Sequence, residues 1–105
     1  MAPDIICLQE VEIKRYDNDI AKAFEAAGYD GVIQKDENRV KKQRITNATF
    51  HRRSKLKLVC EEHRSRTLLT CYRIINGKQQ MSAELIVGNV HLQGFQCINL
   101  LSMTC

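Results

Sequence analysis

Hydrophobic and polar positions along this chain follow the pattern of several short strands and one helix. The first signal is an apolar run at residues 4–8 (DIICL), opened by Pro3, which predicts a strand buried on both faces. The run ends at Gln9 and Glu10. Exposed glutamate is the ordinary case, so from spacing alone Glu10 simply begins a solvated loop. A carboxylate at the carboxyl end of a strand is also where α/β folds hold metal ions and phosphates.

A helix is predicted at residues 17–27, where apolar side chains recur on one face. Asp17 or Asn18 is expected to cap its start, and Gly28 is expected to end it with a left-handed residue. Another short strand is predicted at residues 29–34. The order strand, helix, strand is typical of a fold that packs a helix against a sheet.

The second half of the chain has mainly strand character. The charged segments 35–46 and 61–66 lack apolar periodicity and are predicted to be exposed connections. Asn76-Gly77 is a strong hairpin-turn signal, and Leu85, Ile86 and Val87 are expected to form the buried part of the strand that follows it. The predicted strands are 47–52, 54–59, 67–75 and about 79–91. We therefore predict an α/β (α+β) fold, a partial two-sheet sandwich with mixed strand directions.

Length and charge limit the possible functions. The chain has 105 residues, enough for one domain at most, and a formal net charge of +4. Its basic residues form two runs, and either run could attract a phosphate backbone or simply be a solvated face. The first run is Arg39, Lys41, Lys42 and Arg44, and the second is Arg52, Arg53, Lys55 and Lys57.

The five cysteines show no CxxC spacing, which favours free thiols and a reducing, intracellular compartment, cytoplasmic or nuclear. Cys60 and His63 have a C-x-x-H spacing, with Cys71 further on. Structural zinc is disfavoured because no second ligand pair has a matching spacing.

Neither a membrane span nor a secretory signal is recognisable, so we expect a soluble protein without membrane partners. Asn47-Ala48-Thr49 matches the N-glycosylation pattern. In a chain without a secretory signal, an unmodified strand start is the better interpretation of this triplet.

Three landmarks resemble a known family. PDIICLQEVE at the amino terminus resembles the metal-binding strand of the endonuclease/exonuclease/phosphatase (DNase-I-like) superfamily, in particular its nocturnin and carbon-catabolite-repressor deadenylase branch. ATFHRRSKLKLV at residues 48–59 and VGNVHLQG at residues 87–94 are similar to two later segments of that branch, in the same order. The resemblance implies the DNase-I-like sandwich and a hydrolase or nuclease lineage acting on RNA, poly(A) in particular, or on another phosphodiester.

The resemblance also implies a site. Glu10 matches the glutamate that holds Mg²⁺, with Mn²⁺ as the alternative, and His91 matches a histidine that contacts the scissile phosphate. Asn89 lies two positions before His91, and residues two apart in a strand point to the same face. We therefore expect Asn89 and His91 to face together toward Glu10 as catalytic residues.

The match to this lineage is incomplete. The family's GD-x-N and Ser-Asp-His motifs have no counterpart here, and neither does the asparagine-bearing strand expected before Pro3. We therefore interpret residues 1–94 as a truncated part of the domain, inactive or nearly so, and residues 95–105 as a divergent tail. Whether the chain is an enzyme is left open. The alternatives are a non-catalytic fragment that binds RNA or protein and a product that does not fold.

Overall fold

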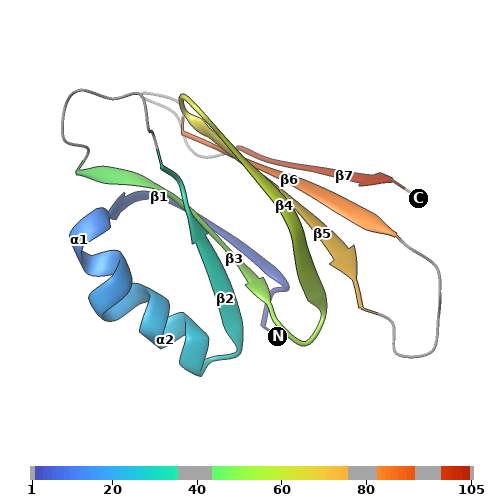
Figure 1. Cartoon of the computed structure of the whole chain (residues 1–105), viewed down its shortest axis with the longest axis horizontal. Helices are drawn as coiled ribbons and strands as arrows, with labels where there is room; N and C mark the ends of the chain where they lie inside the picture. Colours follow the sequence, from blue (N-terminus) through green and yellow to red (C-terminus); the bar gives the residue numbers. More distant parts are fainter. Residues whose placement is uncertain (1, 36–43, 76–82, 92–97, 105) are drawn as a thin grey trace.

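The computed structural model describes residues 2–35, 44–75 and 83–91, and the backbone of residues 98–104. It contains a helical segment and two β-sheets packed in layers (Figure 1). The first sheet has the strand order β1-β3-β2, and the second has the order β4-β5-β6-β7. The strands of the first sheet are β1 (Ile5–Glu12), β2 (Tyr29–Ile33) and β3 (Ile45–Arg52). Those of the second are β4 (Leu56–Arg64), β5 (Thr67–Ile74), β6 (Glu84–Val90) and β7 (Ile98–Thr104). The predicted α+β two-sheet sandwich is confirmed.

Strand directions differ from the expectation of mixed sheets, because every pairing among the described strands is antiparallel. Strands β1 and β2 both run antiparallel to β3, so they point the same way, as a strand-helix-strand unit requires. However, β3 lies between them. The two parallel strands of the unit are therefore not hydrogen-bonded neighbours.

The helix begins earlier than predicted. It comprises α1 (Ile13–Arg15), a π-helical turn η1 (Tyr16–Ile20) and α2 (Ala21–Ala26). Neither Asp17 nor Asn18 is its cap, since the segment follows directly from β1 and the residue before it, Glu12, makes no side-chain cap bond. Gly28 ends the helix as predicted, with φ at +96° and its N–H donating to the Glu25 carbonyl at 3.0 Å.

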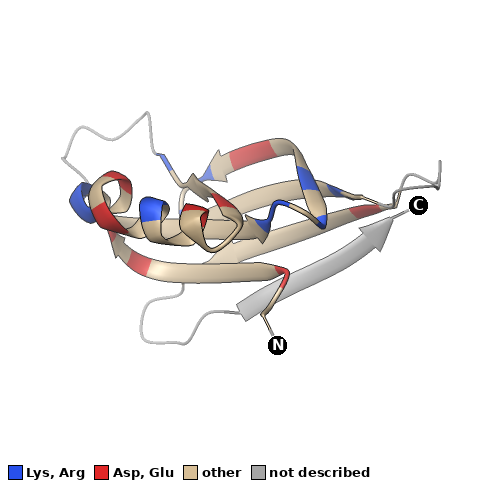
Figure 2. Ribbon diagram, turned by 90° about the horizontal axis from the view of Figure 1, so that it is seen from below, with Lys and Arg blue, Asp and Glu red and all other residues tan. Residues whose placement is uncertain are grey.

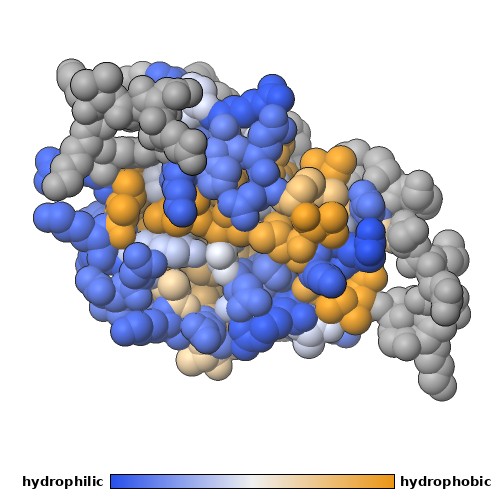
Figure 3. Space-filling model, viewed as in Figure 1, coloured by the Kyte–Doolittle hydropathy of each residue, from blue (hydrophilic) through white to orange (hydrophobic). Residues whose placement is uncertain are grey.

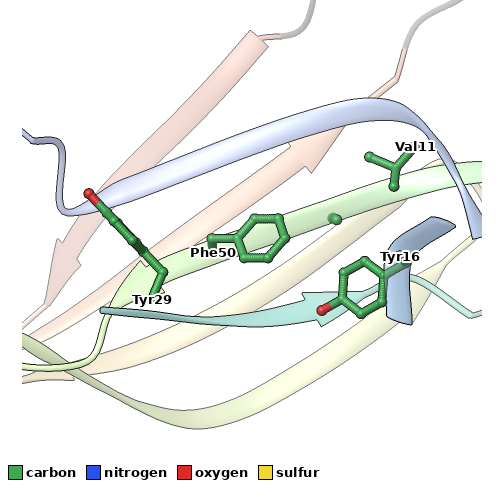
Figure 4. Packing of buried hydrophobic residues seen from close by; sticks show 5 residues of the cluster. Val11, Tyr16, Tyr29 and Phe50 are labelled. Atoms are coloured by element: carbon green, nitrogen blue, oxygen red, sulfur yellow. The ribbon is translucent and has the colours of Figure 1, made fainter. Parts of the chain in front are cut away.

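One hydrophobic core lies between the helix and the first sheet. Phe50 is fully buried at its centre, between Tyr16 and Tyr29 (Figure 4). Its ring stacks on that of Phe24, with centroids 4.1 Å apart. A Cβ on Gly31 would come within 2.4 Å of the Phe50 ring, so only glycine fits at this position of β2. The buried members of this helix-side core are Val11, Tyr16, Tyr29, Ala48 and Phe50.

A second core lies between the two sheets. Its buried members are Leu56, Tyr72 and Val87, and Ile5 and Cys7 of β1 pack against them. Strand β1 sends Ile6 and Leu8 to the helix side and Ile5 and Cys7 to the inter-sheet side, so it packs on both faces as predicted. However, these four side chains are only partly buried.

The second sheet departs from the predictions at three points. Strand β4 continues to Arg64 and so includes much of segment 61–66, which was expected to be a connection. Its charged side chains pair along the strand, Glu61 with His63 at 2.7 Å and Glu62 with Arg64 at 2.6 Å. Of the three apolar residues expected to be buried in β6, Val87 is buried, whereas Ile86 is 37% exposed on the outer face. The backbone of residues 98–104 forms β7, which pairs with β6. The division at residue 94 stays a prediction, and the Asn76-Gly77 turn lies outside the described residues.

Charged residues of both signs are interspersed along the helix and strands (Figure 2). Residues Arg39, Lys41 and Lys42 of the first basic run lie outside the described residues. In the second run, Arg53 pairs with Asp30 at 2.6 Å and Arg52 with Asp4 at 3.6 Å. Hydrophobic side chains reach the surface between the hydrophilic areas (Figure 3), and the most exposed large ones are Ile45, Val59, Ile75 and Ile86.

Candidate functional site

A β-bulge near the end of β1 determines where Glu10 lies. Leu8 pairs with Ala48 and Val11 pairs with Thr46, so Gln9 and Glu10 together stand opposite one residue of β3. The extra residue shifts the alternation, and Val11 returns to the helix-side core that Leu8 contacts. Glu10 takes a positive φ of 55° and is exposed to solvent. The predicted carboxylate therefore lies at an irregular point within the strand, two residues before its end.

The bulge is anchored to the second sheet through Asn89 of β6. Gln9 donates from Nε2 to the Asn89 side-chain oxygen at 2.8 Å. In turn the Asn89 amide nitrogen donates to the carbonyls of Leu8 at 3.2 Å and Ala48 at 3.0 Å, and to Thr49 Oγ1 at 3.1 Å. Asn89 is fully buried. The structure therefore brings Asn89 to Gln9, the neighbour of Glu10, and the Asn89 side chain holds the two sheets together.

Two further amides extend this polar layer between the sheets. Asn47 donates to Gln34 Oε1 at 2.8 Å and to the carbonyls of Arg66 at 3.1 Å and Asn89 at 3.3 Å. Gln34 donates to the backbone carbonyls of Arg64, Ser65 and Thr67 at 2.9–3.2 Å. Both side chains are buried, 4% exposed for Gln34 and 3% for Asn47. The Asn47 side chain is thus enclosed in the folded chain.

His91 lies one residue beyond the end of β6 and is half-buried. Its backbone N–H donates to the Arg66 carbonyl at 3.1 Å, which ties it to the turn between β4 and β5. The Asn47 side chain donates to the same carbonyl. His91 therefore lies at the same end of the sandwich as the amide layer.

The described residues do not by themselves make a magnesium site. None of them form a group of three or more His, Cys, Asp or Glu side chains that could hold a metal ion. Glu10 can offer one carboxylate, whereas Mg²⁺ requires a near-octahedral shell of six oxygen ligands. We therefore derive no chemical step through a metal from these residues alone.

At the opposite end of the inter-sheet space lies His51, which sequence reasoning missed. It is 5% exposed, its ring lies 4.9 Å from that of Tyr72, and its Nδ1 has no hydrogen-bond partner in the described part of the chain. A cavity of about 360 Å³ opens beside it, lined in part by Asp30, Arg53 and Lys57. The alternation of β3 could have indicated an inward histidine, since positions 47, 49 and 51 share one face.

Burial lowers the pKa of His51 below its ordinary value of 6.5; nearby Asp30 opposes this and Arg53 adds to it. The folded protein therefore favours neutral imidazole, while the unfolded chain takes up a proton near pH 6.5. The free energy of unfolding should therefore have its full value above that pH. It should decrease as the pH falls below it, toward the lowered pKa of His51. We expect urea unfolding at about pH 7.5 and about pH 5.5 to show this loss.

Replacing the histidine identifies its contribution to this pH dependence. His51→Asn should flatten the dependence, whereas His91→Asn, at the far end of the sandwich, should leave it as in the wild type. An equal dependence in His51→Asn and wild type would contradict the assignment.

With this geometry described, the class of fold can be stated: the chain is an α+β two-sheet sandwich, consistent with part of a DNase-I-like sandwich. The crystal structure of ANGEL2, a 2′,3′-cyclic phosphatase, is similar over 95% of this chain, with a TM-score of 0.50 and 16% sequence identity. The chain spans 26% of that structure's length. At this level of sequence identity, the likeness shows a shared fold and no more.

The sequence matches no protein-family model and no curated protein. In the described part of the chain, no helix is long and apolar enough to cross a membrane.

Proposed function

We propose that the chain is part of a metal-dependent phosphodiesterase or nuclease domain in which Glu10 is one ligand of a Mg²⁺ or Mn²⁺ ion. The bulge in β1 is the observation that carries this proposal. It exposes the Glu10 carboxylate while Gln9 is held by the buried Asn89. Bulges are frequent beside active sites because they redirect a side chain out of the regular alternation.

Asn89 and His91 have different roles in this proposal. The Asn89 amide is surrounded by Gln9, Leu8, Ala48 and Thr49, so it acts by positioning the bulge. His91 is half-buried at the same end of the sandwich, and its imidazole can donate a hydrogen bond to a phosphate oxygen as negative charge develops there.

RNA is the substrate class that we favour, with poly(A) suggested by the sequence resemblance. The structural neighbour is described as a 2′,3′-cyclic phosphatase, which makes a 2′,3′-cyclic phosphate a second candidate. Both are phosphodiesters, so a metal-bound site of the same kind could act on either.

We further propose that this chain alone has little or no activity. Its described residues offer one carboxylate where a magnesium ion requires a fuller shell. Loss of a single general acid or base commonly costs about two to four powers of ten in rate. Binding of RNA or protein without cleavage is the alternative function for such a chain.

Metal binding at Glu10 can be tested without relying on activity. Mn²⁺ added to the ¹⁵N-labelled chain should broaden the backbone amide signals of residues 9–11 first. Glu10→Gln should weaken this effect by about tenfold or more. Glu12→Gln removes another exposed carboxylate, at the end of the same strand, and should leave the broadening unchanged. Broadening that is centred elsewhere, or that survives Glu10→Gln, would contradict the assignment of Glu10.

Activity is tested separately with labelled oligoadenylate and with RNA ending in a 2′,3′-cyclic phosphate, each in the presence of Mg²⁺. No turnover above background is expected from the chain alone. Cleavage that requires both Mg²⁺ and Glu10 would overturn the proposal that the chain is inactive and would support the assignment of Glu10. Salt-sensitive binding of RNA without cleavage would favour the alternative function.

A further inference from the structure

Two cysteines stand directly opposite each other on neighbouring strands of the second sheet. Cys60 of β4 and Cys71 of β5 are register partners, and a strand irregularity between Leu58 and Cys60 immediately precedes the pair. Opposed residues in antiparallel strands have Cα atoms about 4.5–5.5 Å apart, which lies within the range that a disulfide spans. Both thiols are free in the structure.

We propose that Cys60 and Cys71 form a reversible cross-strand disulfide, so that the outer face of the second sheet is a site of thiol oxidation by peroxide. This site is independent of the Glu10 end of the molecule and of the proposed catalytic lineage. The two cysteines have different surroundings, so each has a different role in the oxidation.

Cys60 is the residue that reacts first with the peroxide. It is exposed on β4, which is the edge strand of its sheet. Cys71 is half-buried on the inner strand β5, and its Sγ donates to Glu84 Oε2 at 3.6 Å. Partial burial, the adjacent Cys60 thiol and the Glu84 carboxylate together raise the pKa of Cys71 to about 11. Because the thiolate is the nucleophile, the raised pKa and the partial burial of Cys71 both slow its attack on a peroxide.

Two displacements complete the reaction. The Cys60 thiolate attacks one peroxide oxygen, the O–O bond breaks, and the departing hydroxide takes a proton to become water, leaving a sulfenic acid on Cys60. Cys71 then loses its proton, for which Glu84 Oε2 is the nearby acceptor, and attacks the Cys60 sulfur. The S–S bond forms, the S–O bond breaks, and a second water leaves. Two thiols have been oxidised and one peroxide has been reduced to two waters.

The sequence makes this linkage easy to detect. Trypsin cuts after Lys57, Arg64, Arg66 and Arg73, so the two cysteines fall in separate peptides, LVCEEHR and TLLTCYR. The reduced full-length chain is treated with hydrogen peroxide, blocked with an alkylating reagent, digested and analysed by mass spectrometry. We expect the two peptides to be joined with the loss of two hydrogen atoms, and dithiothreitol to separate them.

Single variants test the order of the steps. Cys71→Ser should leave Cys60 as a sulfenic acid, and its labelling by dimedone should increase severalfold over the wild type. Cys60→Ser should abolish the linked product without a matching increase of label on Cys71. Cys7→Ser is the matched control, since this half-buried cysteine lies in β1, and the Cys60–Cys71 linkage should be unchanged.

Oxidation in urea separates the effect of the fold from intrinsic thiol chemistry. The preference for this pair should fall toward a random distribution among the five cysteines of the chain. The proposal is overturned if no disulfide forms in the native chain, if Cys60 pairs mainly with Cys97 or Cys105, or if the preference persists in urea.

Discussion

Phe50→Ala should lower the free energy of unfolding by about 3–5 kcal/mol, which is a large part of the total stability of a domain of this size. Phe50 is fully buried and stacks on Phe24, with ring centroids 4.1 Å apart, while Tyr16 lies at 6.0 Å. Truncation therefore leaves a cavity at the centre of the helix-side core. Gly31 opposite has no side chain that could fill it. Urea unfolding followed by circular dichroism measures the change.

Phe50→Leu is the control for this prediction, because it keeps an apolar side chain in the same space and loses only the aromatic stacking and part of the volume. Its cost should be well below that of alanine, about 1–2 kcal/mol. If Phe50→Ala and Phe50→Leu lower the free energy of unfolding by the same amount, stability would not depend on the volume filled by the side chain at position 50. A loss below about 1 kcal/mol for alanine would mean that the helix does not pack on the sheet as described.

Local sequence patterns were sufficient to identify most elements of the fold. Residues 5–8 of the predicted apolar run form the first half of β1, and Gly28 ends the helix with a positive φ. These signals are local, since they depend on side-chain periodicity or on the backbone freedom of one residue. The strand at 61–64 was missed for the opposite reason. Its charged side chains look like those of a loop, yet an edge strand can expose them and pair them along its length.

The candidate site was only partly predictable. Glu10 was identified as an exposed carboxylate, but the bulge that exposes it depends on which residues of β3 pair with β1, and alternation within one strand does not reveal that pairing. Gln9 and Asn89 meet although they are 80 residues apart in the sequence. Gln34 and Asn47 are polar and would ordinarily be exposed, whereas here they are buried because they satisfy one another and the backbone carbonyls of the turn after β4.

Asn89→Ala should destabilise the protein by about 2–4 kcal/mol and disturb the Glu10 end of the sandwich at the same time. The substitution removes the acceptor of Gln9 Nε2 and the donor to the Leu8 and Ala48 carbonyls, in a position with no exposed surface. Buried polar groups that lose a partner carry the cost of their lost hydration. Hydrogen exchange should therefore accelerate at the amides of residues 8–11 beyond what global destabilisation explains.

Asn18 provides a matched comparison within the same chain. Its side chain donates to the Lys14 carbonyl at 3.1 Å, but on an exposed helical surface where water can replace the bond. Asn18→Ala should therefore change stability by about 0.5 kcal/mol or less. Asn89→Asp keeps the shape and the acceptor but places a carboxylate against the Leu8 and Ala48 carbonyls, so it should be at least as harmful as alanine. If Asn89→Ala costs no more than Asn18→Ala, or if Asn89→Asp is tolerated, the amide layer does not join the two sheets. The positioning of Glu10 through Gln9 would then lose its support.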